Sequence, residues 1–135
     1  MWDKLFNSAD LLQKGLQASW TRNAVIRNNI ANVETPGFKS SDVEFETLFA
    51  AALEEADFKG KRTREKHIPI GNNDVFNVHH QIVENRRTSM RMDGNNVDIE
   101  AENVKLAQNS IQYNTLMTKL NSELSRIRMA INEGR

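Results

Sequence analysis

Two adjacent histidines and a nearby carboxylate are the residues of this chain whose types best suit metal chemistry. His79, His80 and Glu84 would be ligands for a zinc ion if one helix face gathered them, and such a site would support hydrolysis. Neighbouring side chains on a helix point in different directions, and no cysteine or carboxylate pattern completes a ligand set. We interpret the histidines as a surface pair and expect no metal, with a metal-dependent hydrolase as the alternative.

The remaining patterns of catalytic chemistry are missing. The chain has no Gly-x-Ser-x-Gly nucleophile elbow, and Gly71, Gly94 and Gly134 are isolated, without the spacing of a phosphate-binding loop. Cysteine is absent, which excludes disulfides and thiol nucleophiles. The sequence therefore predicts no enzyme, no cofactor and no small-molecule substrate.

A basic run from Lys59 to Lys66 has the charge to contact phosphate groups. The chain as a whole is balanced, with 18 basic and 18 acidic residues, so no net field attracts nucleic acid or an anionic membrane. We interpret the run as a solvated loop and expect no nucleic-acid partner. A nucleic-acid binder remains an alternative that salt-sensitive DNA retention would support.

The run from Asn28 to Lys39 is rich in hydrogen-bonding amides and ends abruptly. Three of its first five residues are asparagine, a middling helix former, so the amides are better explained by bonds at a crowded packing surface. Pro36 pushes Thr35 out of the helical region, and Gly37 tolerates a positive φ. A helix is therefore predicted to end at or before Glu34.

The two ends of the chain carry the elements that must position these amides. Apolar residues advance by threes and fours through both terminal segments, which is typical of coiled-coil helices. The N-terminal seam consists of Trp2, Leu5, Ala9, Leu12, Leu16, Ser19, Asn23, Ile26, Ile30 and Val33. The C-terminal seam consists of Leu106, Ser110, Tyr113, Met117, Leu120, Leu124, Ile127 and Ile131. A two-helix hairpin leaves half of each stripe in water, so we expect full helicity to require neighbouring subunits.

Weaker signals occupy the middle of the chain. Ser41 with Glu44 forms a capping-box pattern, which predicts a short amphipathic helix over about 42–56. The turn Asp93-Gly94-Asn95-Asn96 lies between alternating apolar residues and predicts a small hairpin before the last helix. His67-Ile68-Pro69 is expected to be extended.

These patterns together predict a mainly α fold. Its long N- and C-terminal helices pair as an antiparallel coiled coil, with a short third helix and a small irregular or β-hairpin middle region. The expected segments are an N-terminal helix at 1–34, a corner and short helix at 35–58, a middle region at 59–97 and a C-terminal helix at 98–135. The start lacks the features of a cleaved signal peptide, so sequence chemistry alone would place the protein in the cytoplasm.

The corner run resembles the signature of the flagellar rod, hook and hook-filament junction family, Asn-Asn-Ile-Ala-Asn-x-x-Thr-Pro-Gly-Phe/Tyr. The matching residues are Asn28, Asn29, Ile30, Ala31, Asn32, Thr35, Pro36, Gly37 and Phe38. A companion motif, followed by Glu102, Ala107 and Tyr113, resembles the family's entry to its C-terminal helix. This motif consists of Asp93, Gly94, Asn95, Val97 and Asp98. Glu34 and Asn103 depart from residues frequent in the family. With its short length and its His67-Ile68-Pro69 segment, the chain is most similar to the proximal rod members of the flagellar basal-body rod proteins.

The resemblance implies a structural subunit of the proximal rod, which transmits torque from the MS ring and surrounds the export channel. It implies as partners copies of the chain itself, the rod proteins FlgC, FlgF and FlgG, the rod-base adaptor FliE with the MS ring, and the flagellar type III export apparatus. It also replaces the cytoplasmic prediction with a periplasmic rod reached by export without a cleaved signal. Phe45 and Phe49 resemble an export-gate motif, although two phenylalanines on a packed helix face explain them equally well. The alternative function is a generic coiled-coil adaptor.

Overall fold

The computed structural model describes residues 2–57 and 78–133 and shows three helices and two strands in these ranges. The elements are α1 (Trp2–Ala31), β1 (Ser41–Glu44), α2 (Glu46–Asp57), β2 (Gln81–Glu84) and α3 (Ile99–Glu133). Side chains are described for residues 8–52 and 78–132. The basic run at 59–66, the His67-Ile68-Pro69 segment and the side chain of Leu5 lie outside the described residues.

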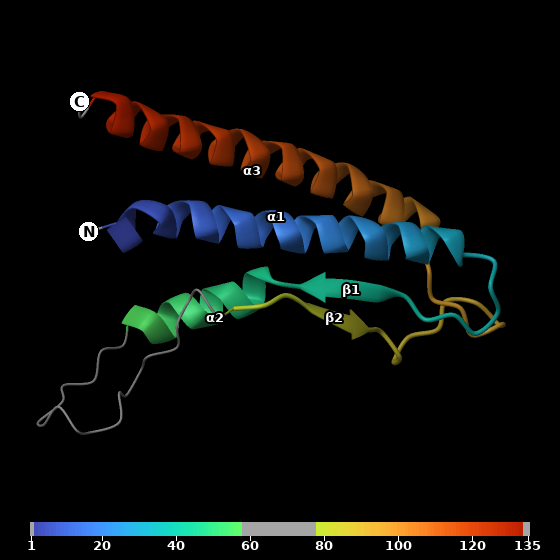
Figure 1. The fold of residues 1–135 in the computed structure, drawn as a ribbon. Coiled ribbons are helices and arrows are strands. Elements are labelled where there is room, and N and C mark those ends of the chain that lie inside the picture. Colours follow the sequence, from blue (N-terminus) through green and yellow to red (C-terminus); the bar gives the residue numbers. More distant parts are fainter. Residues whose placement is uncertain (1, 58–77, 134–135) are drawn as a thin grey trace, which may run out of the picture.

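Helix α1 is the middle layer of the fold. Figure 1 shows α3 running back along one side of α1, while α2 and the two strands lie along its other side. The first turn of α1 and the last turn of α3 therefore lie at the same end of the molecule. This arrangement confirms the predicted fold class, with paired terminal helices, a short middle helix and a small antiparallel sheet. No helix in the described ranges is long and apolar enough to cross a membrane.

Part of the predicted seam of α1 is buried. Ala9, Leu16, Ser19 and Ile26 are all buried, and Ile26 is only 1% exposed. The α1 residues that approach or bind side chains of α3 include Gly15, Ser19, Arg22 and Asn29, and of these four Ser19 alone belongs to the predicted seam. Gly15 allows close approach, because a Cβ atom built there would lie 3.3 Å from Cδ1 of Leu116 on α3. Small residues at this crossing therefore let the two backbones come together.

The packed face of α3 differs in part from the predicted one. The periodicity placed Ser110 in the seam, but Ser110 is exposed and its neighbour Asn109 is buried. Met117, also predicted in the seam, and its neighbour Leu116 are both half-buried. Leu124, also expected inside, is 44% exposed. The residues shared by both descriptions are Leu106, Tyr113, Leu120 and Ile127, and all four are half-buried. The helix is thus rotated about its axis relative to the most apolar arrangement.

The two strands pair antiparallel across a long stretch of sequence, with Ser41 opposite Glu84. The predicted capping box at Ser41 and Glu44 is wrong, because these residues are the ends of β1 and α2 begins only at Glu46. The side chain of Asn29 binds the backbone N–H and C=O of Ser41 at 3.0 and 2.8 Å. This contact with α1 holds Ser41 in an extended conformation that local sequence does not reveal.

The hairpin predicted around Asp93–Asn96 is also wrong, because the strands pair elsewhere. Residues 91–94 form turns and bends, and the backbone N–H groups of Met90 and Arg91 both bind the carbonyl of Asn95 at 3.1 Å. Gly94 has φ of 84°, as the expected turn requires. The turn was predicted correctly, but Asn95 points inward and its flanking residues pair with no strand in the described part of the chain.

The burial of Ile26 generates a stability prediction. Ile26→Ala should lower the free energy of unfolding by about 2 to 5 kcal/mol, because it leaves a cavity between α1 and its neighbours. Ile111→Ala makes the same chemical change at a site that is 69% exposed, so its effect should stay within about 0.5 kcal/mol. Chemical denaturation followed by circular dichroism measures both variants, and equal losses would contradict the described packing.

Candidate functional site

The corner after α1 is where the two sequence motifs meet. The chain leaves the helix after Ala31 through a tight turn in which the Thr35 N–H donates to the Asn32 carbonyl at 3.0 Å. Gly37 has φ of 71°, and its N–H donates to the carbonyl of Asp93 at 2.9 Å. The N-terminal motif is therefore joined directly to the C-terminal one.

Asn95, from the C-terminal motif, caps the turn that follows α1. The backbone carbonyls of this turn lie beyond the helix and, where they are buried, need donors from elsewhere. The side-chain Nδ2 of Asn95 donates to the carbonyls of Asn32 at 3.0 Å, Val33 at 3.1 Å and Thr35 at 2.9 Å. Its Oδ1 accepts the Val97 N–H at 2.7 Å, and the residue is 0% exposed. One buried amide thus fixes the turn after the first long helix and orients the chain just before the second.

Asn96 extends this network to the segment after β2. Its Oδ1 accepts the Ser40 N–H at 2.7 Å, and its Nδ2 donates to the Asn85 carbonyl at 2.8 Å and the Thr88 hydroxyl at 3.1 Å. Lys39 also connects the segment before β1 to the segment after β2, because its ammonium donates to the Thr88 carbonyl at 2.9 Å. Segments far apart in sequence are therefore held together mainly by side-chain amides.

Asn29 is the buried amide of the N-terminal motif and connects three elements. Besides its two bonds to Ser41 on β1, its Nδ2 donates to Oε2 of Glu102 on α3 at 3.0 Å. Asn29 is 0% exposed and Glu102 4% exposed. The amide occupies the outer edge of β1 much as a neighbouring strand would, by pairing with both backbone groups of one residue.

The negative charge of Glu102 is balanced by Lys105. The Lys105 ammonium lies 2.9 Å from Glu102 and 2.9 Å from Asp42 on β1. Desolvation by itself would lower the pKa of Lys105, but the hydrogen bonds to Asp42 and Glu102 outweigh it and raise the pKa. The lysine therefore remains charged and neutralises a buried carboxylate that would otherwise be costly.

A second polar cluster links all three helices further from the corner. Arg22 of α1 donates from Nη1 to Oε1 of Glu46 at 2.8 Å and from Nη2 to the Val43 carbonyl at 3.1 Å. Gln112 of α3 donates to the same Glu46 oxygen at 3.2 Å. The hydrogen bond from Arg22, opposed in part by desolvation, lowers the pKa of Glu46 from 4.5 to about 2.

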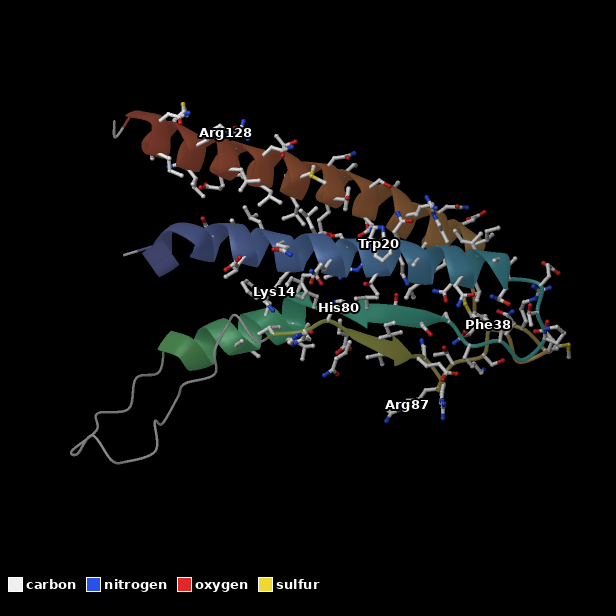
Figure 2. The ribbon with its side chains drawn as sticks, viewed as in Figure 1. Lys14, Trp20, Phe38, His80, Arg87 and Arg128 are labelled. Atoms are coloured by element: carbon white, nitrogen blue, oxygen red, sulfur yellow. The ribbon has the colours of Figure 1, made fainter. Side chains whose placement is uncertain are left out.

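The outer half of the N-terminal motif faces solvent. Asn32 donates from Nδ2 to Oδ1 of Asn28 at 2.8 Å, and the Thr35 hydroxyl donates to Oδ1 of Asn32 at 3.2 Å. Thr35, Pro36 and Gly37 are exposed, while Phe38 is half-buried beside the corner (Figure 2). The motif thus has a buried side that shapes the corner and an exposed side available to other molecules.

Other predicted site residues lie apart from the corner. His80 lies 3.0 Å from the Thr21 hydroxyl, and Glu84 pairs with Arg86 at 2.9 Å. No group of three metal-ligating side chains occurs among the described residues. Phe45 and Phe49 are half-buried and stack with their ring centroids 5.6 Å apart.

Sequence reasoning missed several residues that hold the site together. Asn96, Lys105, Arg22 and Glu46 bind partners in distant segments, so nothing in their local sequence marks them. The spacing of the C-terminal helix did contain a signal for Asn109. Seam residues follow one another after three or four positions, and Asn109 lies three residues after the seam residue Leu106. The prediction used the four-residue step to Ser110 instead.

The cap formed by Asn95 predicts a large loss on truncation. Asn95→Ala should lower the free energy of unfolding by at least about 2 kcal/mol, because three carbonyls of the turn after α1 lose their donor. Asn121→Ala, at an exposed position of α3, is the matched control and should have little effect. Urea denaturation measures both, and a neutral Asn95→Ala would show that the cap is unimportant.

The depressed pKa of Glu46 predicts an acid-dependent contribution to stability. A carboxyl group with a lower pKa in the folded state stabilises the fold fully above its unfolded value near 4.5 and ceases to do so as the pH falls toward about 2. The melting temperature of the unmodified chain should therefore fall more steeply between these pH values than that of Glu46→Gln. Glu46 is 54% exposed, so the difference should be modest. Parallel curves would contradict the Arg22–Glu46 contribution.

Comparison with known proteins extends beyond the corner. A family model described as flagella basal body rod protein matches residues 11–39. The flagellar basal body rod protein FlgB of Bacillus subtilis (strain 168) is 31% identical over 92% of this chain and 92% of its own length. FlgB of Proteus mirabilis (strain HI4320) is 30% identical over 99% of this chain and 100% of its own, and FlgB of Borreliella burgdorferi is 33% identical over 84% and 86%.

The similarity covers both long helices, the corner and the segments between them. The similarity is therefore not confined to the corner motif. The chain belongs to the flagellar basal body rod protein family, whose members are structural rather than enzymatic.

Proposed function

We propose that this chain is a subunit of the proximal rod and polymerises through its long helices into a tube that carries torque and surrounds the export channel. The observation that supports the proposal is that polar side chains are buried where the subunit leaves large apolar side chains exposed. The subunit buries Asn29, Asn95, Glu102 and Asn109, while large apolar side chains on α3 remain in water. The exposed apolar residues of α3 include Val104, Ile111, Leu124, Met129 and Ile131.

The outward surface of α3 suits burial against another helix. Leu124 and Ile131 lie seven residues apart on one side of α3 and are 44% and 54% exposed, and exposed apolar surface of this kind marks interaction sites. Ile111, which is 69% exposed, lies on a different side of the helix, together with Thr115 and Thr118.

The dimensions of the helices also fit a load-bearing tube. α1 has 30 residues and α3 has 35, which correspond to about 45 and 50 Å at about 1.5 Å per residue. Long helices packed side by side pass force through many contacts at once. The exposed part of the corner motif, at Asn28, Thr35 and Pro36, is positioned to contact an adjoining subunit.

The partners proposed for this subunit are copies of itself, FlgC, FlgF and FlgG, the adaptor FliE with the MS ring, and the type III export apparatus. Membership of the rod protein family supports assembly with other rod proteins, and the specific neighbours rest on the resemblance. The proposed location is the periplasmic rod, reached by export without a cleaved signal. Phe45 and Phe49 are proposed to act in export before the chain folds, because their rings are half-buried against each other afterwards.

A generic coiled-coil adaptor is the alternative function. It would explain the paired helices but gives no role to the exposed part of the corner motif. A discrete, stable dimer of the purified chain would favour the adaptor, whereas a rod subunit should remain monomeric until it joins a growing assembly.

The proposal predicts that two charge substitutions on α3 will act differently. Leu120 is half-buried, so Leu120→Asp should disturb the subunit itself and abolish assembly. Leu124 is 44% exposed, so Leu124→Asp should leave the helical content of the purified chain unchanged but prevent rod formation. Soft-agar swimming and the yield of basal bodies, in a strain whose own copy is deleted, measure assembly.

Ser125→Asp adds the same charge at an adjacent exposed position and is the matched control. It should swim normally. Full motility of the Leu124→Asp strain would show that this surface is not used in the rod.

A further inference from the structure

Helix α3 has two rows of residues that compete to face α1. Both rows flank a common row formed by Leu106, Tyr113, Leu120 and Ile127. We define the inner row as Glu102, Asn109, Leu116 and Glu123. We define the outer row as Ser110, Met117, Leu124 and Ile131.

Hydrophobic burial alone favours the outer row. It contains three large apolar side chains, whereas Leu116 is the only one in the inner row. The structure nevertheless turns the inner row toward α1, with Glu102 4% and Asn109 2% exposed. In the outer row Ser110 is exposed, and Leu124 and Ile131 are 44% and 54% exposed, while Met117 is half-buried, as Leu116 is in the inner row. Some interaction must therefore oppose the more apolar arrangement.

Asn109 makes the interaction that requires the inner row to face inward. Its Nδ2 donates to the backbone carbonyl of Ser19 on α1 at 2.9 Å, and Ser19 is 1% exposed. At the next inner-row position, Leu116 fills the space beside Gly15. Glu102 is tied to Asn29, but it lies seven residues from Asn109, or about 10 Å along the axis. The corner therefore orients the start of α3, and Asn109 provides a second fixed point along it.

The environment of Asn109 indicates a role in specificity rather than in stability. Its Oδ1 is buried and is the one buried side-chain polar atom without a hydrogen-bond partner among the described side chains. A buried acceptor left unpaired is costly, so an apolar residue would stabilise the isolated helix pair better. A buried amide in a helix seam is a known way to specify one arrangement of the helices at the expense of stability.

We propose that Asn109 is a positioning residue that sets the rotation of α3 on α1 and keeps Leu124 and Ile131 of the outer row on the surface. Residues of the two rows are neighbours in sequence and so lie about 100° apart around the helix. The centre of the packed face lies midway between the common row and whichever row faces α1. Exchanging the rows therefore rotates the helix by half that angle, about 50°. The use of the outer row as a contact for neighbouring subunits rests on the proposed function. The rotation itself is a property of the single chain.

The absence of native cysteine makes this rotation measurable by disulfide trapping. One double variant, Gly15→Cys with Leu116→Cys, reports the inner row facing α1. The other, Gly15→Cys with Met117→Cys, reports the outer row. In the purified full-length chain under mild oxidation, we expect the first pair to cross-link at least about ten times faster than the second.

Replacing Asn109 should remove this preference. In an Asn109→Leu background the ratio of the two cross-linking rates should fall at least about tenfold. Asn109→Ala, which is smaller and cannot clash with Ser19, should lower the ratio in the same direction. Gln108→Leu introduces the same apolar side chain at the exposed neighbouring position and should keep the original ratio.

A ratio that stays unchanged in both Asn109 variants would overturn the proposal, and so would an equal fall in Gln108→Leu. These measurements need no assembled rod. Normal swimming of Leu124→Asp would count against the proposed function while leaving the cross-linking result intact, so the two failures are distinguishable.

Discussion

The carbonyl groups in the turn that follows α1 need donors from elsewhere in the chain, and the buried amide of Asn95 provides them. Its Nδ2 serves the carbonyls of Asn32, Val33 and Thr35, so the chain can turn sharply without leaving these acceptors unpaired. Because Asn95 lies just before α3, the same contact sets where the second long helix begins. The cap therefore links the turn after the first long helix directly to the segment that leads into the second.

Two further buried amides, Asn96 and Asn29, connect the corner to the two strands and to α3. Asn96 binds the backbone before β1 and the segment after β2, and Asn29 binds β1 and Glu102 together. Amides suit this role because each carries both donor and acceptor atoms and adds no charge that must be neutralised. The one buried carboxylate in this network, Glu102, is accompanied by Lys105. The corner is therefore specified by directional bonds, whereas the helices beyond it are held largely by packing.

The distribution of polar and apolar side chains suits a component of a larger assembly. A protein that functions alone would gain stability by burying Leu124 and Ile131 and exposing Asn109, but this chain does the reverse. In the assembly proposed above, directional bonds within the subunit leave Leu124 and Ile131 outside, where a neighbouring rod protein would cover them. The single subunit would then be less stable than it could be, but its outer surface would be defined.

The sequence by itself determined the features that arise from local physics. The three- and four-residue spacing predicted both long helices, and Thr35-Pro36-Gly37 predicted where the first one stops, because these signals act within a few residues. Tertiary structure decided what depends on distant partners. Ser41 is extended because Asn29 binds its backbone, and α3 presents Asn109 rather than Ser110 because the carbonyl of Ser19 accepts its amide. Apolar periodicity records which residues avoid water, but it carries no information about such pairings, so it left open which of two similar faces would turn inward.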